Sequence, residues 1–114
     1  MKAYNHALSS VKKFGGKVED YIKIHEWFDE SKGFYGDLRH RALRHHTQGI
    51  VECEKLFGVT ITNSNNKKVV VKSIAEQHIL EDLGFLPTME SWFKNIMPQK
   101  WMSSIRHQVP KNLN

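Results

Sequence analysis

Three pairs of a histidine and a carboxylate recur in the sequence at spacings that place both members on one face of an α-helix. The pairs are His25 with Asp29, His78 with Asp82, and His45 with Glu52. Residues four or seven apart share a face because a helix turns by about 100° per residue. Imidazole and carboxylate groups are common ligands of zinc, manganese, iron and nickel, and a carboxylate can also orient a ligating imidazole. The spacing therefore favours either a divalent-metal site or a set of structural hydrogen bonds.

Hydrophobic periodicity turns two of these pairs towards the interior. We expect helices over residues 18–30 and 74–83, and in each of them the histidine and the aspartate lie in the middle of an apolar face. The residues that define these faces are Val18, Tyr21, Ile22 and Phe28 in the first helix, and Ile74, Ala75 and Ile79 in the second. A carboxylate on such a face is costly unless it is paired, hydrogen-bonded or bound to a metal.

The longest expected helix covers residues 34–57 and ends at Gly58. Its apolar stripe contains Phe34, Leu38, Ala42, Cys53 and Leu56, with Gly49 allowing close approach by a neighbour. Cys53 on this stripe is expected to be a small core residue. A straight helix directs the third pair inward, with the carboxylate at the edge of the stripe.

Polar residues in the first half of this helix divide between two sides. His45 and His46 are expected to face the interior. His40 and Arg44 project to the opposite side. Arg41 lies at the margin of the stripe, where it could approach an anion beside the interior histidines.

If the three helices converge, the sequence predicts one polar site in the core. The expected metal ligands are His25, His45, His78, Asp29 and Asp82. For catalysis, Asp29 or Asp82 would act as general base and Arg41 would neutralise the charge of a phosphorylated substrate. His6 lies at the edge of another apolar face and is a weaker candidate for the same site.

The remaining elements complete the expected fold. Further helices are predicted at residues 3–14, before Gly15–Gly16, and at 88–96. The β-branched runs 59–62 and 69–73 flank the turn-rich stretch NSNNKK and predict a hairpin. The fold class is therefore mainly α: a small helical bundle with one two-stranded β-hairpin inserted between helices.

Composition limits the organisation of the chain and its partners. A length of 114 residues fits one helical domain, expected over residues 1–102, with a flexible C-terminal tail over 103–114. A net charge of +5 favours anionic partners such as a nucleotide, another anionic small molecule or nucleic acid. The single cysteine excludes an intramolecular disulfide and fits a cytoplasmic location. The sequence lacks a signal-peptide pattern and a membrane-length apolar run, so no membrane partner is expected. Exposed aromatic residues are compatible with a homodimer.

Several motifs together resemble an uncharacterised family of small bacterial and phage proteins. The resemblance covers about residues 5–102 and includes the patterns H-R-A-x-x-H and E-Q-H. Its signature residues here are His6, His25 with Asp29, His40-Arg41-Ala42, His45, and Glu76-Gln77-His78 with Asp82. The family has no assigned activity, so the resemblance implies a shared residue set without a reaction. The elements more distantly resemble the histidine–aspartate phosphohydrolases, which implies a helical metal site, although their adjacent His-Asp dipeptide is absent.

Three functions fit these observations. The first is a metal-dependent hydrolase of a phosphorylated or nucleotide substrate. The second is a binding module without catalysis, of bacterial or phage origin, that sequesters a nucleotide or engages nucleic acid or a host protein. The third is a purely structural polar core that fixes the packing of the helices.

Overall fold

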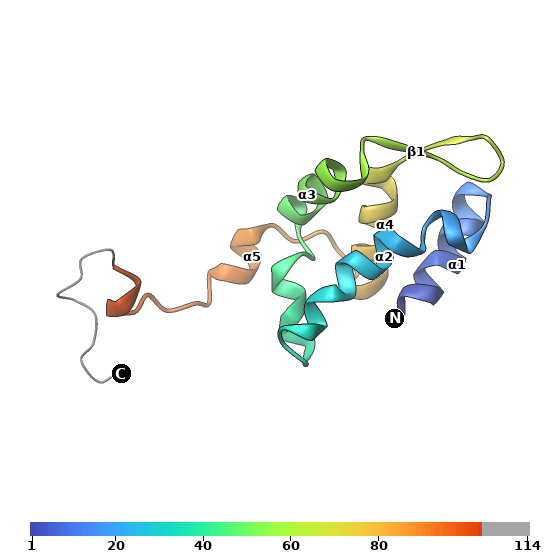
Figure 1. Cartoon of the computed structure of the whole chain (residues 1–114). Coiled ribbons are helices and arrows are strands. Elements are labelled where there is room, and N and C mark those ends of the chain that lie inside the picture. The colour runs from blue at the N-terminus through green and yellow to red at the C-terminus, as the bar shows by residue number, and fades with distance from the viewer. Residues whose placement is uncertain (104–114) are drawn as a thin grey trace.

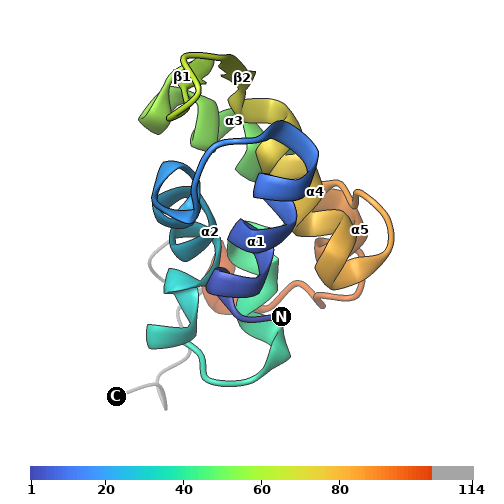
Figure 2. The same ribbon diagram turned by 90° about the vertical axis from the view of Figure 1, so that its right-hand side faces the viewer.

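Helices make up most of the chain, and a single hairpin separates two of them (Figures 1 and 2). The computed structural model describes residues 1–103. The α-helices are α1 (Ala3–Phe14), α2 (Ile22–Asp29), α3 (Thr47–Phe57), α4 (Val71–Leu83) and α5 (Met89–Phe93). The 3₁₀ helices are η1 (Val18–Asp20), η2 (Glu30–Gly33), η3 (Leu38–Leu43) and η4 (Lys100–Met102). Strands β1 (Thr60–Thr62) and β2 (Lys68–Val70) pair antiparallel between α3 and α4. The expected fold class is confirmed.

Helix α4 is the central element, because it packs against α1, α2 and α3. Figure 2 shows α1 beside both α2 and α4. The apolar core that joins these helices consists of Ala7, Tyr21, Ile24, Phe28, Ile50, Cys53, Val69, Val71, Ile74, Ala75 and Ile79. Since α4 is covered on several sides, its polar residues Gln77 and His78 are buried as well. They must find partners inside the protein.

The segment after α1 is hydrogen-bonded to the hairpin loop. Gly15 and Gly16 both have positive φ angles, and a Cβ on Gly16 would lie 2.4 Å from Oδ2 of Asp20. Asp20 in turn accepts hydrogen bonds from the backbone N–H (3.0 Å) and the hydroxyl (2.8 Å) of Ser64 in the hairpin loop. The glycines therefore permit a close approach that larger residues would block.

The segment 34–57 is not one helix, and the expectation of a continuous helix is wrong. η3 ends before His46, whose backbone is extended (φ −162°, ψ 173°), and α3 begins after it. The His46 ring accepts a hydrogen bond from the N–H of Gly49 (3.0 Å) and so caps α3. A Cβ on Gly49 would lie 1.8 Å from the carbonyl oxygen of Arg44, so the chain can make this turn because residue 49 is glycine.

This break changes which residues face the interior. His40, expected on the outer side, is only 2% exposed. Phe34 and Leu38, expected in the apolar stripe, are 75% and 68% exposed. Leu56, expected in the same stripe, and Glu52, expected at its edge, are exposed too. The projection of one continuous helix fails because the residues before His46 do not share the axis of α3. The stripe drawn through 34–57 therefore does not coincide with the buried side of α3, which is formed by Gly49, Ile50 and Cys53.

The other boundaries differ less. The segment 18–30 begins as η1 and becomes α-helical only at Ile22, and α4 begins at Val71, three residues before the expected start. α5 is shorter than the helix expected at 88–96, and Thr88 caps it by accepting a hydrogen bond from the N–H of Ser91 (3.2 Å).

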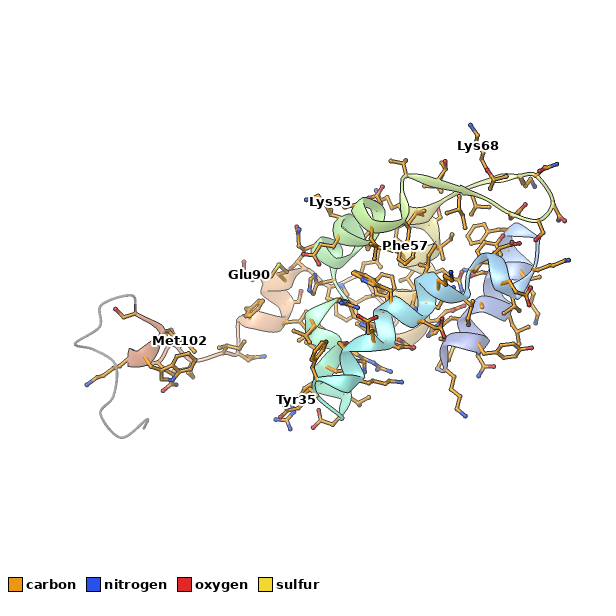
Figure 3. The ribbon with its side chains drawn as sticks, viewed as in Figure 1. Tyr35, Lys55, Phe57, Lys68, Glu90 and Met102 are labelled. Carbon is orange, nitrogen blue, oxygen red and sulfur yellow. The ribbon has the colours of Figure 1, made fainter. Side chains whose placement is uncertain are left out.

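Few features outside the bundle bear on the site. Charged side chains such as those of Lys55 and Lys68 point outward (Figure 3). Among the described residues, no helix is both long and apolar enough to span a bilayer. Most of the predicted tail, residues 104–114, lies outside the part of the chain that the structure describes.

Candidate metal centre

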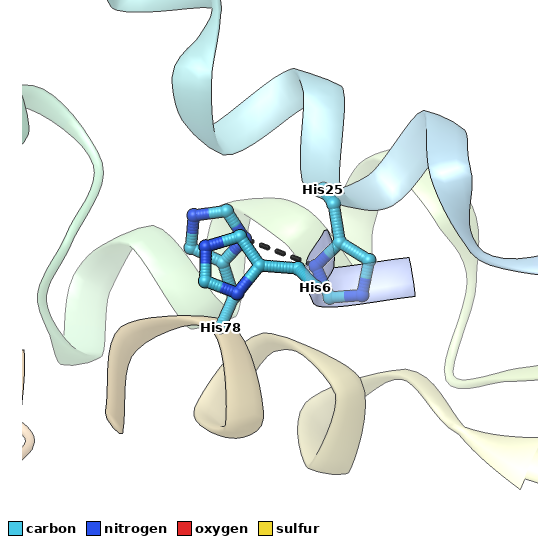
Figure 4. A group of neighbouring side chains, drawn as sticks. All are labelled: His6, His25 and His78. Carbon is cyan, nitrogen blue, oxygen red and sulfur yellow. Dashed lines mark hydrogen bonds between the residues drawn. The ribbon is translucent and has the colours of Figure 1, made fainter. Parts of the chain in front are cut away.

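Four histidines from different parts of the chain meet in the core. They are His6 from α1, His25 from α2, His45 from the turn before α3, and His78 from α4. All four are fully buried. His78 is central: its ring stacks on that of His6 at 3.8 Å between centroids and lies 5.1–5.2 Å from those of His45 and His25. Figure 4 shows three of these rings together.

Two imidazoles and two carboxylates meet at Nε2 of His78, one of the imidazoles being that of His78 itself. We call Asp29, His45, His78 and Asp82 the donor set. Oδ2 of Asp82 lies 3.0 Å from Nε2 of His45 and 3.2 Å from Nε2 of His78. Nε2 of His78 also lies 3.4 Å from Oδ1 of Asp29. One potential ligand atom from each of the four residues falls within 4.8 Å of all the others.

These separations suit a divalent ion. Zinc binds imidazole nitrogen and carboxylate oxygen at about 2.0–2.2 Å, which places neighbouring ligand atoms roughly 2.8–3.6 Å apart in octahedral or tetrahedral geometry. The three measured distances of 3.0–3.4 Å lie in this range. Two carboxylates would also balance the charge of the ion. The cluster can therefore bind a metal, which is the coarse form of the sequence prediction.

Buried polar atoms without hydrogen-bond partners concentrate at the same place. Within residues 1–103, five buried side-chain nitrogen or oxygen atoms lack a hydrogen-bond partner: Asp29 Oδ2, His40 Nε2, Arg41 Nε, His45 Nδ1 and His78 Nε2. Three belong to the donor set. His40 packs edge-on against His45, and Arg41 approaches Asp82. Native proteins leave few such atoms, and a local excess points to an ion or water that completes the network. The residues present therefore fit a metal ion.

Contacts between histidines and carboxylates shift the pKa values of Asp82 and His78. Burial alone would raise the pKa of Asp82, but the hydrogen bonds to His45 and His6 and the close contact with Nε2 of His78 outweigh it and hold the pKa far below its usual range. Burial would likewise lower the pKa of His78, yet the carboxylates of Asp29 and Asp82 raise it above the ordinary value. A positive charge at Nε2 of His78 is therefore favoured, and a metal would have to replace that proton.

The second oxygen of Asp82 is held by groups outside the donor set. Oδ1 accepts a hydrogen bond from Nε2 of His6 (3.1 Å), and Nη2 of Arg41 lies 3.7 Å away. The other ring nitrogen of His6 lies 2.7 Å from Oε1 of Glu81. Glu81 also accepts a 2.9 Å hydrogen bond from the amide of Gln77. This arrangement leaves Oδ2 of Asp82 directed at the imidazoles of His45 and His78.

A second group of nitrogens lies on the opposite side of His78. His6, His25 and His78 also offer potential ligand atoms within 4.8 Å of one another. Both ring nitrogens of His25 form hydrogen bonds here: Nδ1 faces Nδ1 of His78 at 2.9 Å, and Nε2 faces the hydroxyl of Ser10 at 2.8 Å. Burial, and then the nearby His78 and His6, lower the pKa of His25 to about 3. His25 therefore lies beside the donor set and not within it.

The structure brings most of the expected site residues together. Asp29, His45, His78 and Asp82 converge, Arg41 reaches their edge, and His6 is more central than its position on α1 suggested. Burial raises the pKa of the Cys53 thiol to about 12, which fits the expected core role. Ser10 and Glu81 were missed, and Gln77 was named only as part of the family motif. A signal was present, because Gln77 and Glu81 flank His78 and Asp82 on the same helix, four residues apart.

Comparisons with known proteins agree with the motif-based resemblance. The family model described as a domain of unknown function, DUF6915, matches residues 1–102. No curated protein and no solved structure matches the chain. The matched region includes all of the histidines and carboxylates described above, and its extent confirms the resemblance to a family without an assigned activity. The chain belongs to the DUF6915 family.

Proposed function

We propose that the protein binds a divalent transition-metal ion through Asp29, His45, His78 and Asp82. The observation that carries this proposal is the convergence of one potential ligand atom from each of these residues within 4.8 Å of the others, beside three buried atoms that lack hydrogen-bond partners. Imidazole and carboxylate together suit zinc, manganese, iron or nickel, and the four residues present no thiolate that would favour a softer metal. Such an ion would replace the proton at Nε2 of His78, which lies between the two carboxylates, and would offset their charge.

A hydrolase acting on phosphorylated or nucleotide substrates is the reaction that this site supports best. A bound divalent ion supplies Lewis-acid activation of water. Asp29 would be the better general base, because its Oδ2 has no partner while its Oδ1 faces the donor set, whereas both oxygens of Asp82 are engaged by histidines. Arg41, whose side chain is 18% exposed, would bind a phosphate oxygen of the substrate. Asp29, 13% exposed, marks the side from which a substrate would approach.

A binding module without turnover is the second candidate, and burial favours it. His45 and His78 are fully buried and Asp82 is 1% exposed, so four protein ligands could close the coordination shell. Structural metal sites are closed in this way, whereas catalytic sites keep a position for water or substrate. A nucleotide or nucleic acid would then bind elsewhere on the basic surface.

Metal content tests the proposal directly. Untagged protein, purified without chelator, should contain close to one equivalent of a transition metal by elemental mass spectrometry. His78→Ala and His45→Ala should lose it, while His46→Asn should keep it, because asparagine can still cap α3 and His46 is not in the donor set. A wild-type protein that takes up no zinc, manganese, iron or nickel on reconstitution would overturn the proposal.

Turnover separates the two functions. The reconstituted protein should hydrolyse p-nitrophenyl phosphate, bis-p-nitrophenyl phosphate or nucleoside triphosphates if it is a hydrolase. Asp29→Asn and Arg41→Gln should then reduce kcat/KM. A protein that holds one equivalent of metal, binds nucleotide in calorimetry and forms no product would favour the binding module.

A further inference from the structure

A chain of hydrogen bonds runs from Gln77 through Ser10 and His25 to Nδ1 of His78. Which atom donates in each bond follows from the orientation of the Gln77 amide. Nε2 of Gln77 lies 2.9 Å from the carbonyl oxygen of His6 and 2.9 Å from Oε1 of Glu81. Both partners are acceptors only, so this end of the Gln77 amide must be the NH₂ group. The opposite orientation would place three acceptors together. Oε1 of Gln77 therefore points at the hydroxyl of Ser10, 2.7 Å away.

Ser10 passes this direction on to His25. The Ser10 hydroxyl has one hydrogen and two neighbouring acceptors, Oε1 of Gln77 (2.7 Å) and the carbonyl oxygen of His6 (3.1 Å). Its hydrogen is used by one of them, so the oxygen presents a lone pair to Nε2 of His25, 2.8 Å away. Nε2 of His25 must then carry a hydrogen.

His25 transfers the direction to His78. Its two ring nitrogens face Ser10 and His78, and neither of these hydrogen-bond contacts is a carboxylate that would stabilise an imidazolium. A neutral His25 with its hydrogen on Nε2 has a lone pair on Nδ1. That lone pair accepts a hydrogen bond from Nδ1 of His78 at 2.9 Å. His78 therefore carries a hydrogen on Nδ1.

We propose that Gln77, Ser10 and His25 form a positioning relay that fixes the tautomer of His78 and presents the lone pair of its Nε2 to the metal centre. The purpose of the relay rests on the proposed metal binding, although its direction does not. His25, expected from sequence to be a ligand, is thus a positioning residue. The group of His6, His25 and His78 is not a second ion site, because the nitrogens of His25 and Nδ1 of His78 are used in hydrogen bonds.

The relay also explains why a cation is needed beside Nε2 of His78. A neutral His78 with its hydrogen on Nδ1 directs the Nε2 lone pair at Asp29 and Asp82, with oxygens at 3.4 and 3.2 Å. Three electron-rich atoms at these distances repel one another unless a proton or a metal ion lies between them. The relay therefore prepares a cation site whose selectivity depends on the donor set.

Long-range ¹H–¹⁵N spectra of the histidine rings test the relay, because protonated and unprotonated ring nitrogens have well-separated shifts. In the metal-free protein, His25 should be protonated at Nε2 only. In the zinc-loaded protein, His78 should keep its hydrogen on Nδ1. A hydrogen on Nδ1 of His25 in either state would overturn the relay. Because the first measurement needs no metal, failure of metal binding and failure of the relay are distinguishable.

Two substitutions at His25 test what the relay does for binding. His25→Asn can place a side-chain carbonyl near the former Nδ1 and still accept from His78, whereas His25→Leu cannot. Zinc affinity should fall about 10–100-fold in His25→Leu, as for other outer-shell partners, and recover towards wild type in His25→Asn. Both should still bind one equivalent. Equal zinc affinities in two variants with matching circular dichroism spectra would overturn the positioning role. If either variant fails to fold, the ¹H–¹⁵N spectra of the wild-type protein still test the relay.

Discussion

The two sides of the His78 ring are built from similar residues but are completed in opposite ways. On the Nδ1 side, His25, Ser10 and Gln77 form neutral hydrogen bonds of 2.7–2.9 Å. On the Nε2 side, Asp29 and Asp82 carry charge, and the nearby His45 has a ring nitrogen without a partner. Both sides are buried, so burial alone does not distinguish a structural network from a binding site.

The difference lies in hydrogen-bond satisfaction, which distinguishes the neutral network from the proposed metal site in this core. A buried neutral network that satisfies its members makes the packing of α1, α2 and α4 specific. A buried charged cluster with orphan atoms has a free energy that an added cation can lower. The helices thus position one complete network and one incomplete cluster around a single imidazole.

The largest effect is expected from Asp82→Asn, which removes the charge that three histidines, Arg41 and the N-terminal ammonium of Met1 share. Loss of one partner of a buried ionic cluster typically costs about 3–5 kcal/mol. Metal binding should also be lost. Urea unfolding of the metal-free protein and elemental analysis measure the two effects. Glu52→Gln, at an exposed carboxylate, is the control and should change neither. An Asp82→Asn protein that keeps one equivalent of metal would contradict the assigned donor set.

Acid should destabilise the metal-free protein through the neutral side. The pKa of His25 is about 3 in the folded protein, whereas an unfolded chain titrates near the ordinary value of about 6.5. The unfolded state therefore binds more protons below pH 6.5, and stability falls as pH drops towards 3, by a few kcal/mol. His78 has the opposite sign, since its raised pKa contributes stability that is lost as pH rises through the folded value. Chemical unfolding from pH 8 to pH 4 should show a maximum, and His25→Asn should flatten the acid limb. Unchanged stability between pH 6.5 and pH 4 would contradict the buried neutral His25.

A moderate effect is expected from Ser10→Ala, which breaks the neutral network. It leaves Nε2–H of His25 and Oε1 of Gln77 without their partner. An unsatisfied buried group costs roughly 1–3 kcal/mol, measured by thermal or urea unfolding. The variant should still bind one equivalent of metal, with lower affinity. Loss of stoichiometric binding would show that Ser10 belongs to the metal centre itself.

The smallest effect is expected from His46→Asn. The side chain of His46 caps α3 and contacts neither side of the His78 ring. Asparagine is among the best N-cap residues, so stability should change by less than about 1 kcal/mol. Metal affinity, measured by competition with a chelating dye, should stay within a factor of two or three. A large loss of affinity would show that the turn between η3 and α3 is coupled to the position of His45.

Local sequence patterns predicted much of the site because they predicted the buried faces of α2 and α4 correctly. His25, Asp29, His78 and Asp82 lie inside as the periodicity of α2 and α4 indicates. The same method failed for His40, because it assumed a helix through residues 44–46. One residue with an extended backbone, His46, changes the direction of the helix axis and with it the direction of the preceding side chains.

The sequence by itself determined the fold class, the hairpin and the inward direction of two histidine–aspartate pairs, since these depend on hydrophobic periodicity and turn chemistry. Only the tertiary structure decided that His25 faces Ser10 while His45 faces Asp82, and that His6 joins them from α1. These contacts join residues up to 76 positions apart, and local spacing carries no information about which distant groups meet. The direction of the hydrogen bonds, and with it the division of one histidine cluster into two sides, arises from the packing of α1, α2 and α4.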